Sequence, residues 1–122
     1  MTREIKFRSW DKSRNEMFIP SAIVNPTDNE ITVIEGGDYR LDKFRLGEYF
    51  LMQFIGLKDK KGKEVFEGDI ISRAGAYILW NDRLACWCFN FKKAKTPDTP
   101  LFHVDIFEII GNIYENPELL ET

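Results

Sequence analysis

The residues best suited to chemistry are two carboxylates in the stretch Glu67-Gly68-Asp69. A carboxylate pair at this spacing can act as acid and base or hold Mg²⁺. Asp82 and the single histidine, His103, would complete a metal-dependent hydrolase. However, no third ligand lies near the pair in sequence, and Asp and Gly are favoured in turns. We therefore expect a turn at 67–69, no enzyme, no catalytic or metal site, and no cofactor.

The loop 58–63, KDKKGK, resembles a phosphate-binding loop only in containing a glycine and lysines. A P-loop needs a lysine followed by Ser or Thr, between a strand and a helix. Here Lys63 is followed by Glu64, and strand-like residues flank the loop on both sides. The pattern predicts a hairpin in which Asp59 opens the turn and Gly62 takes a positive φ at its close.

The two cysteines, Cys86 and Cys88, are one residue apart and fall on the same face of a predicted strand. A metal site would need further ligands, and the chain has no other cysteine and one histidine. Free cysteine is commonly buried as a small apolar residue. We therefore expect both to be core or half-buried residues.

Two groups of residues could bind nucleic acid. A base would stack on the aromatic member while lysines contact phosphates. The 17 basic and 20 acidic residues give a net charge of −3, which weakens any overall attraction to nucleic acid or an anionic membrane. The alternative interpretation is a solvated strand face and a soluble loop. The candidate partner-binding residues are Lys6, Arg8 and Trp10 on one strand face, and Lys92, Lys93 and Lys95 in a loop.

Short runs of strand-forming residues, separated by turns every six to twelve residues, would position these groups. With 122 residues and no long amphipathic helix, the chain predicts one all-β domain, a barrel or meander with minor helical turns. Pro20 should lie at a sheet edge or a bulge. The segment 38–50 fits neither a strand nor a helix well. The expected strands are 3–10, 16–24, 30–35, 50–57, 64–66, 70–80, 84–91, 101–104 and 108–114, with a turn or short helix at 116–120.

Charge and hydropathy bear on location and association. No run approaches the ~18 apolar residues of a transmembrane helix, and the N-terminus lacks the apolar core of a signal peptide. We therefore expect a cytoplasmic protein with no membrane partner. From residue 98 onward there are six acidic residues and no Lys or Arg, which favours self-association into a homo-oligomer. These acids are Asp98, Asp105, Glu108, Glu115, Glu118 and Glu121.

Three blocks of the chain closely resemble the YopX family of phage and prophage proteins. They are REIKFRSWD at 3–11, LMQFIGLKDKKGKEVFEGDII at 51–71 and IIGNIYENPELL at 109–120. Ile55 stands where the family usually has Thr, a change between β-branched residues. The segments 19–49 and 72–106 carry no motif that can be aligned.

The resemblance implies a fold rather than an activity. It predicts an SH3-like β-barrel at 50–115, an N-terminal β extension at 1–49 and a turn or short helix at 116–122, together forming one domain. We interpret the chain as a non-catalytic binding or assembly module of a phage or prophage, acting on a protein partner or on itself in the bacterial host. The core residues expected in the central block are Met52, Phe54, Leu57, Val65, Phe66 and Ile70.

Overall fold

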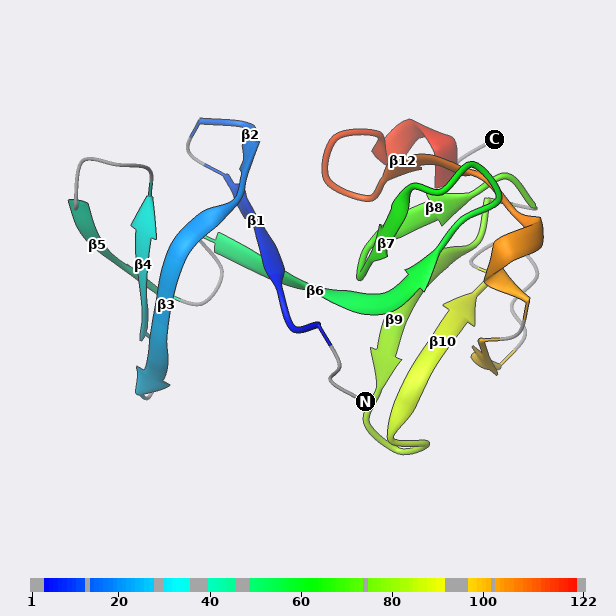
Figure 1. Ribbon diagram of the computed structural model, residues 1–122, viewed down its shortest axis with the longest axis horizontal. Helices are drawn as coiled ribbons and strands as arrows, with labels where there is room; N and C mark the ends of the chain where they lie inside the picture. Colours follow the sequence, from blue (N-terminus) through cyan, green and yellow to red (C-terminus); the bar gives the residue numbers. More distant parts are fainter. Residues whose placement is uncertain are drawn as a thin grey trace. The chain divides into compact units, whose positions relative to one another are not determined.

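The computed structural model describes residues 4–12, 14–27, 30–35, 40–45, 49–73, 75–91, 97–101 and 103–120 (Figure 1). Within these ranges the regular elements are twelve β-strands and two short 3₁₀ helices. The all-β class with minor helical turns is thereby confirmed, whereas the SH3-like barrel stays a prediction. No helix in the described ranges is long and apolar enough to cross a membrane.

The contacts within the chain define two compact units. We call Lys6–Gln53 the N-terminal unit, and Phe54–Thr122 together with Met1–Ile5 the C-terminal unit. Strand β6 (Tyr49–Lys58) begins in the first and ends in the second. The prediction of one domain with inner borders near residues 50 and 116 stays a prediction.

In the N-terminal unit, β1 (Phe7–Asp11) pairs antiparallel with β2 (Glu16–Phe18) and with the beginning of β6. A separate antiparallel sheet has the order β3-β4-β5. Its strands are β3 (Pro20–Thr27), β4 (Glu30–Glu35) and β5 (Arg40–Arg45).

The strand pairing in this sheet can be compared with two expectations from the sequence, for Pro20 and for the segment 38–50. Pro20 begins the edge strand β3, and the register shifts between Pro20 and Ala22. The predicted edge or bulge is therefore confirmed, because proline cannot donate to the ladder. The ambiguous segment 38–50 contains strand β5, which pairs with β4 without a register shift from Arg40 to Arg45.

The C-terminal unit contains the hairpin formed by the end of β6 with β7 (Glu64–Phe66), and a five-stranded antiparallel sheet of order β11-β10-β9-β8-β12. In Figure 1, β9 and β10 run side by side as a hairpin. The sheet strands are β8 (Asp69–Ile71), β9 (Tyr77–Asn81), β10 (Cys86–Asn90), β11 (Thr99–Pro100) and β12 (Ile109–Asn112). The 3₁₀ helices are η2 (Val104–Ile106) and η3 (Pro117–Leu120).

The strand predicted at 101–104 is wrong. His103 adopts a left-handed conformation with φ 47°, and η2 begins at Val104. A residue in that region turns the chain out of the extended path. The expected turn or short helix at 116–120 is confirmed by η3.

Buried side chains of the C-terminal unit form one core cluster. The prediction that Leu57 belongs to the core is wrong, because this residue is 46% exposed. Gly56 has φ +89°, and the β6–β7 register shifts between Phe54 and Lys58. The alternation of faces therefore breaks just before Leu57. The cluster comprises Val65, Ile71, Ala76, Ile78, Phe89, Val104, Phe107 and Ile109.

Asn112 organises the turn that follows β12. Its side-chain oxygen accepts the backbone N–H of Tyr114 at 3.0 Å and of Glu115 at 2.8 Å. The backbone N–H of Asn116 in turn donates to the Asn112 carbonyl at 2.9 Å. This side-chain-to-backbone pattern is what Asn supplies in turns.

We expect Asn112→Ala to lower the free energy of unfolding by about 1–2 kcal/mol, because two backbone N–H groups lose their acceptor. Urea denaturation followed by circular dichroism measures the change. Asn112→Asp keeps an acceptor and serves as the control. Equal losses in the two variants would contradict this role for Asn112.

Candidate binding pocket

The residues proposed from sequence as a basic site lie in different parts of the chain. Lys6 and Arg8 are half-buried, and Trp10 is only 8% exposed. Little of the indole face is therefore open to a stacking base. Lys92, Lys93 and Lys95 lie outside the described residues. The basic site stays a prediction.

Of the carboxylate pair, Glu67 lies in the predicted turn with Gly68, and Asp69 follows the turn as the first residue of β8. Asp69 is buried and accepts the backbone N–H of Phe66 at 2.8 Å, while Gly68 takes φ 88°. Asp82 and His103 are exposed. Across the described part of the chain, no group of three His, Cys, Asp or Glu side chains could hold a metal ion.

Asp59 anchors the hairpin loop 58–63. Its carboxylate accepts three backbone N–H groups, from Lys61 at 2.9 Å, Lys63 at 2.8 Å and Ile109 at 3.0 Å. Burial of the carboxyl opposes its ionisation, but these hydrogen bonds and the nearby Lys63 ammonium outweigh burial and lower the pKa of Asp59. Gly62 has φ +82°. The predicted hairpin, opened by Asp59 and closed by Gly62, is confirmed.

The same loop fixes the position of Phe107. The backbone N–H of Lys60 donates to the Phe107 carbonyl at 2.9 Å, and the Phe107 N–H donates to the Val104 carbonyl at 3.0 Å. Beside it, the Lys61 ammonium lies 2.9 Å from the Glu108 carboxylate. Both backbone groups of Phe107 are therefore held, and its ring has a defined place.

Strand β10 supplies the second wall of the site. Trp87, Phe89 and Phe91 alternate onto its core-facing side. The Phe89 ring is 1% exposed and meets Phe107 edge-on, with ring centres 6.0 Å apart and an interplanar angle of 88°. The centre of the Phe91 ring lies 6.1 Å from the centre of the Phe89 ring. The edge-to-face contact between Phe89 and Phe107 is favourable for aromatic rings, whereas the rings of Phe89 and Phe91 are tilted by 54°.

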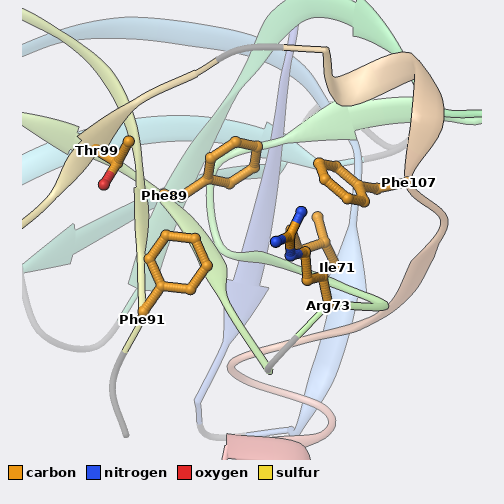
Figure 2. A pocket seen from close by; sticks show the side chains of 6 residues that line it. All are labelled: Ile71, Arg73, Phe89, Phe91, Thr99 and Phe107. Carbon is orange, nitrogen blue, oxygen red and sulfur yellow. The ribbon is translucent and has the colours of Figure 1, made fainter. Parts of the chain in front are cut away.

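Between these rings the C-terminal unit has a cavity of about 250 Å³. Figure 2 shows Thr99 on one side of it and Arg73, with Phe107 and Ile71, on the other, with the Phe89 and Phe91 rings between them. The wall is mainly aromatic and aliphatic, and its polar groups are a hydroxyl and a guanidinium. The lining residues are Ile71, Arg73, Phe89, Phe91, Thr99 and Phe107.

Arg73 is exposed at the border of the pocket, and its guanidinium carbon lies 6.0 Å from the centre of the Phe107 ring. This distance permits a cation–π interaction. Ser72, the residue before Arg73, is held by two hydrogen bonds to Glu108. Its N–H donates to the Glu108 carbonyl at 2.9 Å, and its Oγ accepts the Glu108 N–H at 3.2 Å. The Arg73 carbonyl accepts the N–H of Ala76 at 3.1 Å.

The polar groups of the pocket lining, Arg73 and Thr99, are suited to binding a ligand and not to transferring protons. A guanidinium remains protonated at physiological pH and has no acceptor, and a threonine hydroxyl does not ionise in this range. What the pocket can supply is apolar contact, ring edges and faces, and one fixed positive charge.

The two cysteines lie on the opposite face of β10, with Sγ atoms 3.8 Å apart. Cys86 is half-buried and Cys88 is fully buried, as predicted. Burial raises the pKa of Cys88 to about 11, with further contributions from Cys86 and the Asp98 carboxylate. Asp98 is itself held by the side-chain amides of Asn81 and Asn90, each at 2.8 Å.

We expect Cys88 to be nearly inert toward thiol reagents in the folded protein. Raising a thiol pKa by two units lowers its thiolate fraction at pH 8 about 100-fold. Mass spectrometry after maleimide treatment at pH 8 should show one label in the native protein and two in urea. Rapid double labelling of the native protein would contradict this expectation, and Cys88→Ser, which leaves one thiol, controls the assignment.

Comparison with known proteins places the chain in a family. The family model described as YopX protein matches residues 6–121. The chain belongs to the YopX family. The resemblance carried by its three sequence blocks is thereby confirmed. No functionally curated protein matched the chain.

Two solved structures resemble this YopX chain along nearly its whole length. Protein EF1440 from Enterococcus faecalis is 26% identical with a TM-score of 0.62, and the match covers 98% of this chain and 99% of that one. Protein yopX from Bacillus subtilis is 18% identical with a TM-score of 0.62, covering 93% and 96%. The second likeness shows the fold alone.

The pocket of this YopX chain was not among the sites predicted from sequence. Its residues come from segments that the sequence does not connect, 71–73, 89–91, 99 and 107. The available signal was the alternation of Trp87, Phe89 and Phe91 along the predicted strand 84–91, which places three large rings on one face. Arg73 carried no signal, since a single arginine after a strand is common on protein surfaces.

Proposed function

We propose that this YopX chain is a non-catalytic binding module of a phage or prophage, and that it docks on a protein partner through the aromatic pocket. The observation that carries the proposal is the cavity of about 250 Å³ walled by Phe89, Phe91 and Phe107 and bordered by Arg73. A concave apolar surface with few, well-placed polar groups is the general form of a binding site.

The size of the pocket favours one side chain as its occupant. Sites for whole small molecules usually span about 300–1,000 Å³. At about 250 Å³, this cavity is below that range and suits a single large apolar side chain. Such an anchor, seated in a pocket and surrounded by weaker contacts, commonly dominates the energy of a protein interface.

Nucleic-acid binding is the alternative that the sequence raised, and the pocket supports it less. A base inserted between aromatic walls needs partners for its polar edges, since burying them unpaired is unfavourable. In the lining only the Thr99 hydroxyl and the Arg73 guanidinium are polar. The basic residues proposed for that role, Lys6 and Arg8, do not line the pocket.

The test is affinity capture from bacterial lysate, with and without nuclease treatment, comparing the wild-type chain with Thr99→Phe. Thr99 lines the cavity, so the larger ring fills it. Arg83→Ala is the control, because Arg83 is exposed in the β9–β10 turn and does not line the pocket. Thermal unfolding of each variant verifies that it folds.

The proposal requires a protein that the wild type and Arg83→Ala retain and Thr99→Phe loses. Identical protein sets from all three chains would overturn it. Capture that disappears on nuclease treatment, together with a salt-dependent shift of single-stranded DNA or RNA, would instead establish the nucleic-acid alternative.

A further inference from the structure

Arg73 presents a positive charge at the pocket that the described residues do not neutralise. Among them, no carboxylate lies within ion-pairing distance of its guanidinium, which lies beside the Phe107 ring. The nearby Glu108 carboxylate is engaged by Lys61 at 2.9 Å. An exposed cation beside an apolar cavity defines the chemistry of a complementary ligand.

We propose that the occupant is an extended acidic segment of a protein partner. One large apolar side chain of the segment enters the cavity, and an Asp or Glu two residues away pairs with Arg73. This inference rests on the proposed function and specifies the segment that the pocket recognises.

The two-residue spacing between the apolar residue and the acidic residue follows from the geometry of extended peptides. The Arg73 guanidinium carbon lies 6.0 Å from the centre of the Phe107 ring, which forms one wall of the cavity. In a strand, side chains at positions i and i+2 share a face and are about 6.6–6.8 Å apart. An apolar residue and a carboxylate at this separation can therefore reach the cavity and the guanidinium together, whereas position i+1 points away.

The position of Arg73 favours a carboxylate partner. Its guanidinium carbon lies 6.0 Å from the centre of the Phe107 ring, and the hydrogen bonds of Ser72 with Glu108 hold the adjacent backbone before binding. A planar guanidinium can bind a carboxylate through two parallel hydrogen bonds. A backbone that is held in advance reduces the conformational entropy lost on binding.

The aromatic wall selects the anchor. Phe89 and Phe107 already meet edge-to-face, and a third ring or a branched aliphatic side chain packs well on such surfaces. A polar anchor would be disfavoured, because the walls offer few hydrogen-bonding partners. The recognised pattern is therefore a large apolar residue, any residue, then Asp or Glu, in either chain direction.

Three blocked peptides test the inference: acetyl-Ser-Phe-Ser-Asp-Ser-amide, the same peptide with Asn for Asp, and the same peptide with Ala for Phe. Each is titrated into ¹⁵N-labelled protein and followed by NMR shifts of the pocket amides. The proteins are wild type, Arg73→Gln and, as matched control, Arg83→Gln. Melting temperatures verify that both variants fold.

We expect the Asp peptide to bind the wild type and Arg83→Gln about fivefold tighter than the Asn peptide, in line with a partly exposed charge pair. Arg73→Gln should remove that ratio, and the Ala peptide should leave the pocket amides unmoved. The advantage of the Asp peptide should also shrink as salt is raised.

Other results would overturn the acidic-segment inference in distinguishable ways. Equal binding of the Asp and Asn peptides at the pocket would remove the role of Arg73 and leave the proposed docking function standing. No pocket shift with any peptide, combined with identical captures by wild type and Thr99→Phe, would remove both. Tighter pocket binding of adenosine monophosphate than of the Asp peptide, or a dimer interface that covers the pocket in light scattering and NMR, would assign a nucleotide or a second copy instead.

Discussion

Replacing Phe89 with alanine is expected to lower the free energy of unfolding by about 3–5 kcal/mol, the usual loss for a buried aromatic side chain. The ring is 1% exposed and contacts both Phe91 and Phe107. The void left by the ring would adjoin the existing pocket, because Phe89 is part of its lining. Since domains are typically stable by about 5–15 kcal/mol, such a loss would leave the chain close to unfolding.

Urea denaturation monitored by tryptophan fluorescence measures this loss. Ile106→Ala is the matched control, because Ile106 is a large apolar residue that is 58% exposed, and its removal should change stability by less than about 0.5 kcal/mol. A loss below about 1 kcal/mol for Phe89→Ala would show that the ring does not support the core.

Replacing Asp59 with alanine is the second large change, with an expected loss of about 3 kcal/mol. The substitution removes the acceptor of three backbone N–H groups, and a hydrogen bond to a charged group contributes about 1.5–3 kcal/mol net of the water bonds it replaces. Lys61 and Lys63 are exposed, so water can take over part of the role of the carboxylate there, and the expected loss stays below the sum of three such bonds. The Ile109 bond links the hairpin loop to β12, 50 residues away in sequence. Because the same loop holds the Phe107 carbonyl, the variant should also weaken peptide binding at the pocket.

The lowered pKa of Asp59 gives this prediction a pH dependence. The carboxyl has a lower pKa in the folded protein than its ordinary value of 3.8, so its stabilising effect is complete above that ordinary value. The effect is lost as the pH falls through the folded pKa. Asp59→Asn keeps one acceptor oxygen and cannot ionise, so it should lose less stability than Asp59→Ala and show a shallower acid limb.

Urea midpoints of wild type and Asp59→Asn between pH 2 and pH 7 provide the measurement. The two curves should converge toward acid pH as the wild-type carboxyl becomes protonated. Parallel curves over the whole range would show that ionised Asp59 contributes nothing to stability, despite its three hydrogen bonds.

Features encoded over a few residues were predictable. The turn at 67–69 and the hairpin loop 58–63 depend on Asp and Gly acting within four residues, and both are observed. The common face of Cys86 and Cys88 follows from the two-residue period of a strand. Leu57 and the segment 101–104 were predicted wrongly, because left-handed residues at Gly56 and His103 interrupt the periodicity.

The sequence by itself determined the all-β class, the turns, the cysteine face and the YopX family, because local backbone preferences and short motifs encode them. Only the tertiary structure decided the pocket. Phe89 and Phe107 meet because distant strands pair, and Arg73 is held beside them through a hydrogen bond between Ser72 and Glu108, 36 residues apart. Such contacts depend on which segments the folded chain brings together, and residue spacing along the sequence does not specify that.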